Sequence, residues 1–284
     1  MLTGRNSDEG TCPHRSPALG GRCDPWSVRI DARGDPSAAS RELSDAEALR
    51  AVAAAEDALG LVDDVVADGG SVVRDGEKVS VNGSSVTMGE VGTAPAGTAP
   101  LYASDQLDDT TTRLSAVMTS AQTAAPAWTF EEGTELSVLP DGRVSVAEAD
   151  GDLLAGVARP WAVDANGRRL PTSYSASGNV LTQHVEVDSS TAFPVIADPT
   201  FTVFPGYWTA TLNRSESAAA VGTVGSCAAV FSKSPVPALR ALTIACGALA
   251  AFSAAQLAGG KCIKIHVAGL PPFVGTWWPT FPKC

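Results

Sequence analysis

Apolar and polar residues alternate over long stretches of this chain, and this period of two predicts β-strands. The alternation is clearest between residues 130 and 197, where short runs are separated by Gly, Asn and Asp. Residues 135–139 and 143–146 flank Pro-Asp-Gly at 140–142, which is typical of a hairpin turn. Short strands with turns at this spacing indicate an antiparallel β-sandwich or short barrel.

An earlier stretch of the chain shows the same alternation. Val79 and Val81 alternate with polar neighbours, and Asn82-Gly83 predicts a tight turn into a second strand at 85–88. Residues 101–128 show no consistent period and remain ambiguous between irregular strand and loop. We therefore expect a hairpin here, followed by a segment of unassigned structure.

A helix start signal precedes these strands. Ser44 and Glu47 have the spacing of a capping box, in which each side chain bonds the other residue's backbone N–H. The alanine-rich run that follows favours helix, and Gly60 favours its end. The apolar stripe of this helix is thin, which indicates a peripheral position; it consists of Leu49, Val52 and Leu59.

The composition changes again after residue 200. Residues 201–213 are aromatic and β-branched, so they predict a strand. Asn213 or Ser215 can cap a helix that begins at Glu216, whose carboxylate favours the N-terminal end. We expect this helix to reach about Phe231.

A second helix and a final strand complete the predicted C-terminal domain. Ser-Pro-Val-Pro at 234–237 breaks the first helix, and a run of small and apolar residues predicts a second one ending at residue 258. Gly259-Gly260 favours its end, and residues 262–267 alternate as a strand. The short link predicts that the two helices pack antiparallel as a helical hairpin.

Cysteines concentrate at the end of the chain. Two of the six, Cys12 and Cys23, lie in the N-terminal tail and are interpreted as incidental. The other four fall within the last 58 residues: Cys227, Cys246, Cys262 and Cys284. This cluster predicts two disulfides and an oxidising compartment, with buried free thiols as the alternative.

Three pairings of the four C-terminal cysteines are conceivable. Antiparallel packing of the two helices brings Cys227 near Cys246, and the Pro-rich tail can return Cys284 to Cys262 at the start of the last strand. We favour these two disulfides, although a pairing of Cys227 with Cys262 also fits the geometry.

Together these patterns predict an α+β protein, with an antiparallel β-sandwich or short barrel followed by a small disulfide-bonded α/β domain that contains a helical hairpin. The expected parts are a disordered tail at 1–43, a peripheral helix and linker at 44–70, the β-domain at 71–200 and the cysteine-containing domain at 201–284.

The net charge and the absence of known motifs argue against several classes of function. Across 284 residues, 20 Lys and Arg face 31 Asp and Glu, and this net charge of −11 argues against a nucleic-acid partner. His184 and His266 fall on the polar faces of their strands, so both are expected at the surface. Phosphate-loop, zinc and nucleophile motifs do not occur. We therefore expect no catalytic, cofactor-binding or metal-binding residue, no cofactor and no enzymatic activity.

A hydrolase that uses paired carboxylates is an alternative class. Such chemistry requires two carboxylates that converge from separate strands. The candidate pairs are Asp63-Asp64, Asp108-Asp109, Glu131-Glu132 and Asp150 with Asp152.

Several short runs occur in a recognisable order: Asp164-Ala165-Asn166-Gly167, Leu-Pro-Thr-Ser-Tyr at 170–174, Leu181-Thr182-Gln183, and Ala-Phe-Pro-Val-Ile-Ala-Asp-Pro at 192–199. Residues 130–284 thereby resemble uncharacterised exported actinomycete proteins. In these proteins a β module ending in (Y/F)-P-V-x-A-D-P precedes a C-terminal domain with a cysteine-containing helical hairpin. The resemblance implies export, and it implies no activity and no catalytic residue.

The compartment follows from two opposing observations. Residues 1–40 contain no apolar run that could serve as a secretion signal. The clustered cysteines and the resemblance nevertheless favour the extracellular space or the cell envelope.

Two function hypotheses remain beside the hydrolase. The first is an exported non-enzymatic protein, in which the β-domain is a carrier or interaction module and the partner is a cell-envelope or membrane component. The alternative is a membrane-active, bacteriocin-like antagonist with residues 201–284 as the effector. Residues 241–258 carry no charge and reach the lower limit for a bilayer span, and Trp277 and Trp278 suit a headgroup interface.

Overall fold

The computed structural model describes residues 43–61, 70–73, 76–82, 85–90, 99–204, 208–233, 240, 242–268 and 276–284. Most of the predicted tail at 1–43, the turn residues 83–84 and the helix break at 234–237 lie outside these ranges. Residues Glu42–Cys284 belong to one structural unit. Antiparallel sheets dominate this unit, and the α+β class predicted from the sequence is confirmed.

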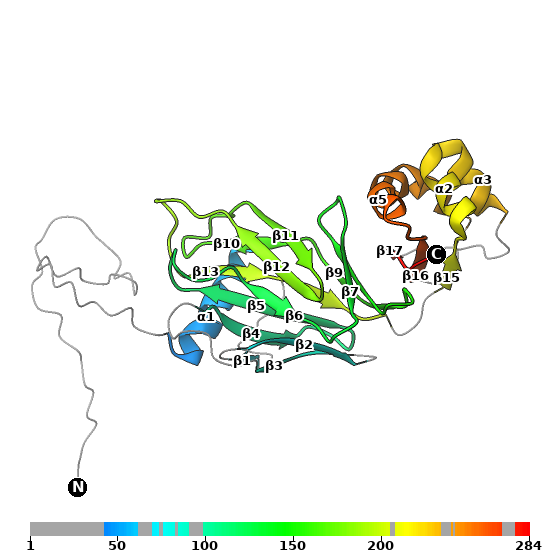
Figure 1. Ribbon diagram of the computed structural model, residues 1–284. Helices are drawn as coiled ribbons and strands as arrows, with labels where there is room; N and C mark the ends of the chain where they lie inside the picture. Colours follow the sequence, from blue (N-terminus) through cyan, green and yellow to red (C-terminus); the bar gives the residue numbers. More distant parts are fainter. Residues whose placement is uncertain are drawn as a thin grey trace, which may run out of the picture. The chain divides into compact units, whose positions relative to one another are not determined.

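A large sheet occupies most of the β-domain (Figure 1). Its strands are β1 (Ser71–Val73), β4 (Leu101–Gln106), β5 (Thr111–Met118), β7 (Glu135–Val138), β8 (Val144–Ala147), β9 (Leu153–Val157), β10 (Trp161–Val163), β13 (Val195–Asp198) and β14 (Thr200–Thr202). The order is β1-β4-β5-β14-β9-β8-β7, with β13 also pairing with β5 and β10 pairing with β13. The hairpin predicted around Pro-Asp-Gly at 140–142 is confirmed as β7 and β8.

A second sheet faces the first. It contains β2 (Gly76–Asn82), β3 (Ser85–Glu90), β6 (Ala127–Thr129), β11 (Thr172–Ser177) and β12 (Val180–Val185), in the order β11-β12-β6-β2-β3. Fully buried side chains from both sheets meet between them, among them Tyr102, Leu114 and Phe201 from the first and Trp128 and Leu181 from the second. The β-domain is therefore sandwich-like, as predicted.

Strand β5 lies in the middle of the large sheet, within the segment that the sequence left ambiguous. Its burial explains the missing alternation, because both faces are covered. Leu114 and Ala116 point into the sandwich core, whereas Val117 belongs to a second apolar cluster on the opposite face. A strand buried on both sides loses the polar face that a period of two requires.

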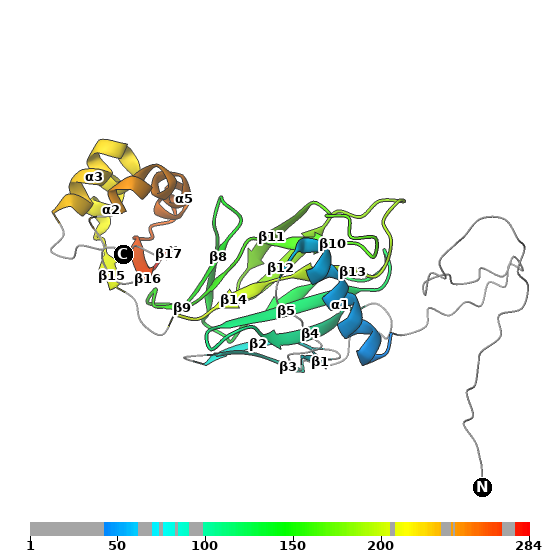
Figure 2. The ribbon, with the colours of Figure 1, turned by 180° about the vertical axis from the view of Figure 1, so that it is seen from behind.

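The cover on that opposite face is helix α1 (Asp45–Leu59), which lies along the large sheet in Figures 1 and 2. Its predicted capping box of Ser44 and Glu47 and its end at Gly60 are both present, with Gly60 at φ +70°. The buried face differs from the predicted stripe and consists of Ala48, Val52, Ala55 and Glu56. Small alanine side chains let the helix approach the sheet closely.

The C-terminal part forms a separate lobe. Its elements are β15 (Trp208–Thr211), α2 (Arg214–Gly222), α3 (Val224–Ser232), the 3₁₀ turn η1 (Leu242–Ala245), α5 (Cys246–Ala258), β16 (Lys264–Ala268) and β17 (Thr276–Thr280). The strands form an antiparallel sheet with β16 in the centre, and the described helices cover one of its faces (Figure 1). We call residues 208–284 the C-terminal lobe.

Two details of the prediction for this part were wrong. The predicted single helix at 216–231 is two helices, because Thr223 forms a second capping box with Ser226 and starts α3 anew. The predicted boundary at 201 lies too early, since Phe201 and Val203 are buried in the sandwich core. The predicted helical hairpin is therefore a packed group of α2, α3 and α5.

Candidate functional site

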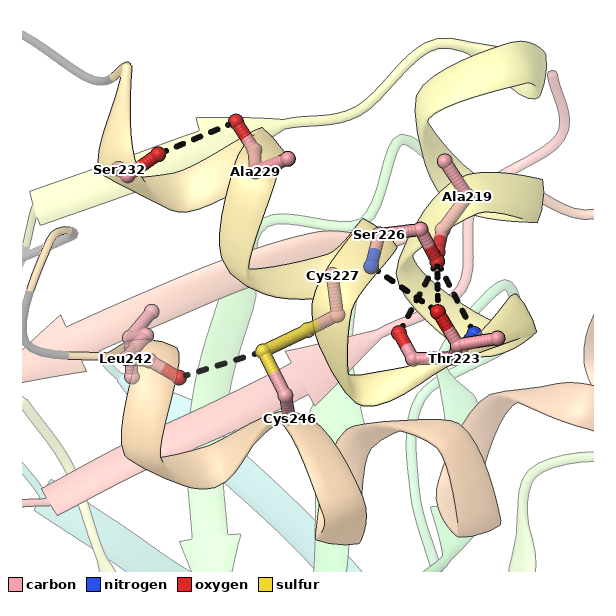
Figure 3. The surroundings of a disulfide bond; sticks show 8 residues. All are labelled: Ala219, Thr223, Ser226, Cys227, Ala229, Ser232, Leu242 and Cys246. Atoms are coloured by element: carbon pink, nitrogen blue, oxygen red, sulfur yellow. Dashed lines mark hydrogen bonds between the residues drawn. A yellow bond between two sulfur atoms is a disulfide. The ribbon is translucent and has the colours of Figure 1, made fainter.

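One disulfide joins two helices of the C-terminal lobe. Cys227 on α3 is bonded to Cys246 at the start of α5, with a Cα–Cα distance of 5.7 Å (Figure 3). Both residues are buried in the lobe's apolar core. The capping box of Thr223 and Ser226 directly precedes Cys227. The start of α3 is therefore fixed by these hydrogen bonds, and the disulfide ties the same helix to α5.

The second disulfide ties down the end of the chain. Cys262 is bonded to Cys284, and the backbone N–H of Cys262 donates to the carbonyl of Pro282 at 2.8 Å. The backbones of Lys261 and Lys283 pair beside this disulfide as an isolated antiparallel β-bridge. Both disulfides thus have the pairing favoured from the sequence, and both close loops within the C-terminal lobe.

The C-terminal lobe packs on the sandwich through its sheet. We call this contact the lobe junction; it joins β16, β17 and the last residues to strands β7–β9 and their turns. Trp278 is buried directly against Gly156 of β9, where any Cβ would overlap the indole ring. The guanidinium of Arg143 lies 4.6 Å from the ring centroid of Trp278 and 5.9 Å from that of Trp277.

Three hydrogen bonds in the lobe junction involve buried polar groups. Ser145 Oγ donates to the carbonyl of Pro279 at 2.7 Å, and Thr280 Oγ1 donates to the carbonyl of Gly151 at 2.6 Å. His266 Nε2 lies 2.9 Å from the same Gly151 oxygen. These bonds satisfy groups that burial would otherwise penalise.

Two ion pairs flank these hydrogen bonds. Lys264 Nζ lies 2.7 Å from Asp152, and Lys261 Nζ lies 2.6 Å from Glu135. The hydrogen bond from Lys264 lowers the pKa of Asp152 below its ordinary value. In both pairs the C-terminal lobe contributes the cation and the sandwich the anion.

The expectation that His266 lies at the surface was wrong, since only 1% of this residue is exposed. Its strand is the centre of a sheet covered on both faces, by helices on one side and by the turn at Gly151 on the other. Burial lowers the pKa of His266 to about 4, and the nearby Lys264 acts in the same direction. At neutral pH the imidazole is therefore uncharged.

A second buried polar cluster lies under α1 and holds it on the sheet. Arg113 of β5 pairs with Glu56 of α1 at 2.7 Å and with Asp198 of β13 at 3.5 Å, and all three side chains are at most 5% exposed. Asp105, opposite Arg113 on β4, is buried as well. Burial raises the pKa of Asp198 to about 7, and Arg113 opposes this rise.

This cluster explains the run Phe-Pro-Val-Ile-Ala-Asp-Pro at 193–199. Val195, Ile196 and Ala197 are fully buried, and Asp198 reaches Arg113. The carbonyl of Pro199 accepts the backbone N–H of Leu114 at 3.0 Å. In this chain the run joins β13 and β14 to β5, so its role is structural.

The other described histidine makes an exposed contact that the sequence analysis did not anticipate. His184 is exposed, as predicted, and its Nε2 lies 2.7 Å from Ser175 Oγ across the β11–β12 hairpin. Serine catalysis also needs a group that orients the base and donors for an oxyanion. The described contacts of this pair include neither.

Two of the carboxylates considered for a hydrolase make contacts of another kind. Asp152 pairs with Lys264, and Asp108 accepts hydrogen bonds from Thr110. Asp63 and Asp64 lie outside the described residues. Over the described ranges, His, Cys, Asp and Glu side chains form no group of three that could hold a metal ion.

The alternative of a membrane span at 241–258 differs from the structure. Residues 242–258 form η1 and the 13-residue helix α5 instead of one long helix. Among the helices that the structure describes, none has both the length and the apolar character that a bilayer crossing requires.

Comparison with known proteins was made at three levels. No protein-family model, no curated protein and no solved structure matches the chain.

Proposed function

We propose that this protein acts outside the reducing cytosol as an exported, non-enzymatic protein, in which the β-sandwich carries the C-terminal lobe to a component of the cell envelope. The observation that carries this proposal is the pair of disulfides within the C-terminal lobe. Structural disulfides persist in oxidising compartments and are rare where glutathione keeps thiols reduced. The resemblance to exported actinomycete proteins agrees with it.

The cores and contacts of the two parts support the proposed roles of the sandwich as carrier and of the C-terminal lobe as the part that binds the partner. The sandwich has its own core, and a second core is centred on Phe231, Leu249 and Ile265 of the C-terminal lobe. This second core also takes in Leu139 and Leu153 of the sandwich, so apolar packing continues across the lobe junction. The lobe junction combines the Trp278 contact with several hydrogen bonds and ion pairs. Contacts of this mixed kind resemble those between separate proteins, which suits a carrier and its cargo.

The exposed side of the C-terminal lobe is the surface offered to the partner. Helices α3 and α5 contain no charged residue, although the chain carries a net charge of −11. Val224 at the start of α3 is 63% exposed. A neutral surface on an acidic protein fits a cell-envelope component better than a strongly charged partner such as nucleic acid.

Thiol labelling of protein recovered from its native compartment tests the export proposal. The sample is alkylated before reduction, and labelled cysteines are identified by peptide mass spectrometry. We expect Cys227, Cys246, Cys262 and Cys284 to be protected before reduction and labelled after it. Labelling of all four without reduction would show that the protein resides in a reducing compartment.

A membrane-active antagonist is the second candidate, and the uncharged surface of α3 and α5 with exposed Val224 favours it. Insertion as a span is not part of this candidate, because 13 residues of α5 reach only about 20 Å at 1.5 Å per residue. Trp277 and Trp278 are also engaged by Arg143 in the lobe junction.

Dye release from lipid vesicles separates the two candidates. The full chain is added to anionic and to neutral vesicles, with a Val224→Glu variant as the matched control. A membrane-active factor releases dye, and Val224→Glu reduces the release. No release at high protein-to-lipid ratio eliminates this candidate and leaves the carrier proposal in place.

A further inference from the structure

Charge is divided very unequally between the parts of this chain. Residues 43–207, which include the whole β-domain, carry 8 Lys and Arg against 24 Asp and Glu, a net charge of −16. The C-terminal lobe at 208–284 carries 6 against 1, a net charge of +5. The overall value of −11 conceals this division, because residues 1–42 are balanced at 6 against 6. An anionic partner is therefore attracted by the lobe and repelled by the β-domain.

The cations of the lobe fall into two groups. Lys261 and Lys264 are paired with carboxylates of the sandwich in the lobe junction. The other four are exposed, and these are Arg214, Lys233, Arg240 and Lys283. Three of the four pair with no carboxylate among the described residues; we call Arg214, Lys233 and Lys283 the unpaired lobe cations. Their charge is available to an anion outside the molecule.

Two of the unpaired lobe cations occupy positions that local structure disfavours. Arg214 is the first residue of α2, where the positive end of the helix dipole repels a cation. Lys283 lies directly opposite Lys261 in the isolated β-bridge, and like charges in that arrangement repel each other. Local stability therefore explains neither residue. Side chains that contradict local preference are expected where they serve a function.

These two cations belong to one corner of the lobe, around Gly260. Arg214 Nη2 lies 3.8 Å from the position that a Cβ on Gly260 would occupy. The backbone N–H of Cys284 donates to the carbonyl of Gly260 at 3.5 Å, and Gly260 directly precedes Lys261 in the chain. The start of α2, the end of α5 and the last residues thus bring Arg214 and Lys283 to the same corner.

The third unpaired lobe cation lies beside an uncharged surface. Lys233 directly follows α3, which contains no charged residue and exposes 63% of Val224 at its start. Helix α5 is uncharged as well. Cations next to uncharged and apolar side chains are typical of peripheral contacts with anionic lipid headgroups. Nucleic acid instead favours densely clustered Lys and Arg.

We propose that the C-terminal lobe binds an anionic lipid surface of the cell envelope through Arg214, Lys233 and Lys283. This inference rests on the proposed function and names the envelope component that it leaves open. Contact is peripheral, and the lobe stays packed on the sandwich throughout. The negative charge of the β-domain turns that part away from the lipid, so the charge division orients the molecule.

Co-sedimentation of the full chain with lipid vesicles tests this partner. Vesicles of phosphatidylcholine alone are compared with an equimolar mixture of phosphatidylcholine and phosphatidylglycerol, at about 0.1 M and about 0.5 M NaCl. We expect binding to the anionic vesicles, weaker by at least about tenfold at the higher salt concentration, and no binding to the neutral ones. Equal binding to both kinds of vesicle, or no binding to the anionic ones, would overturn the proposal.

Matched variants assign the binding to the unpaired lobe cations. The lobe variant is Arg214→Gln/Lys233→Gln/Lys283→Gln. The control removes three exposed cations outside the lobe and has the same net charge; it is Arg50→Gln/Lys78→Gln/Arg159→Gln. Each cation near an anionic surface contributes about fivefold, so the lobe variant should bind about 100-fold more weakly. The control should bind as the wild type does, and equal weakening in both would contradict a site on the lobe.

Thermal unfolding shows whether the lobe variant keeps its fold. Its midpoint should match that of the wild type, because none of the described ion pairs is lost. If the triple variant does not fold, Lys233→Gln alone decides, with an expected weakening of about fivefold. Unchanged binding of Lys233→Gln would then overturn the proposal.

Other partners of the same charge are distinguished by two further measurements. A DNA duplex that binds more tightly than anionic vesicles at equal salt concentration would overturn the lipid assignment. Light scattering without vesicles detects docking of the lobe on the acidic sandwich of a second copy, and oligomers that the lobe variant abolishes would also overturn it. Protected cysteines without vesicle binding would contradict this inference alone, whereas vesicle binding with freely labelled cysteines would contradict export alone.

Discussion

At the scale of single residues, buried charges determine how layers of this protein are attached. Arg113 is a cation inside the large sheet, and it is stabilised by Glu56 from the helix above and by Asp198 from a neighbouring strand. Its guanidinium carbon also lies 6.0 Å from the ring centroid of Trp161. A buried ion pair contributes little net free energy, but removal of one partner is costly because the other remains buried.

Substitution of Arg113 by Met is therefore expected to destabilise the protein at neutral pH by about 3–5 kcal/mol, since two buried carboxylates lose their cation. Urea unfolding at pH 7 measures this loss. Arg159→Met is the matched control, because Arg159 is exposed and its loss should stay within about 0.5 kcal/mol. Equal stability of the two variants would show that the cluster does not hold α1 on the sheet.

Asp198 makes an opposite contribution to pH dependence from His266. Its folded pKa of about 7 lies above the ordinary value of 3.8, so its stabilising effect is complete below pH 3.8 and is lost as the pH rises through 7. Asp198→Asn should remove this decrease in stability between pH 5 and 8. Unfolding free energies at the two pH values test it, and an unchanged slope would assign the effect to another group.

At the scale of secondary-structure elements, turns and helix ends could be predicted from neighbouring residues. Burial by segments that are distant in the sequence could not. The Pro-Asp-Gly turn, the capping box at Ser44 and the left-handed Gly60 depend on neighbouring residues only, and the structure contains all three. Strand β5 escaped the pattern because α1 covers its second face. The burial of His266 was missed because its cover, Gly151, lies 115 residues away in the chain.

The break between α2 and α3 was also missed, although its signal is local. Thr223 accepts the backbone N–H of Ser226, whose hydroxyl accepts the backbone N–H of Thr223. The small apolar residues on both sides concealed this capping box within one continuous helical run. The pairing of Cys227 with Cys246 was nevertheless correct, because it depends on antiparallel packing rather than on where the helix starts.

Thr223→Ala removes this cap and should cost about 1 kcal/mol of unfolding free energy. Ser232→Ala near the end of the same helix is the control, since Ser232 is exposed and its hydroxyl donates to the carbonyl of Ala229 in its own helix. Thermal unfolding of both variants measures the difference. A Thr223→Ala variant as stable as Ser232→Ala would mean that packing alone starts α3.

At the scale of the whole molecule, the last nine residues contain both a disulfide cysteine of the lobe and residues that contact the sandwich in the lobe junction. Phe281 is buried in the lobe's core, and the ring of Pro282 packs on Gly151 of the sandwich turn. Trp278 in the same segment fills the space above Gly156. Cys284 anchors this segment to Cys262, so the second disulfide supports docking as well as folding, whereas the first lies among the helices.

The two disulfides should therefore differ in effect despite closing loops of similar length, 19 and 22 residues apart. Replacing either pair by serine should cost about 3 kcal/mol of lobe stability by loss of loop closure. Only the Cys262→Ser/Cys284→Ser variant should also speed backbone amide exchange at the lobe junction at neutral pH, because the tail that carries Trp278 and Pro282 is no longer fixed. Urea unfolding and hydrogen–deuterium exchange of both double variants separate the two effects. Equal acceleration of exchange at the junction in both would mean that the junction responds to lobe stability in general, and that the tail has no special role in docking.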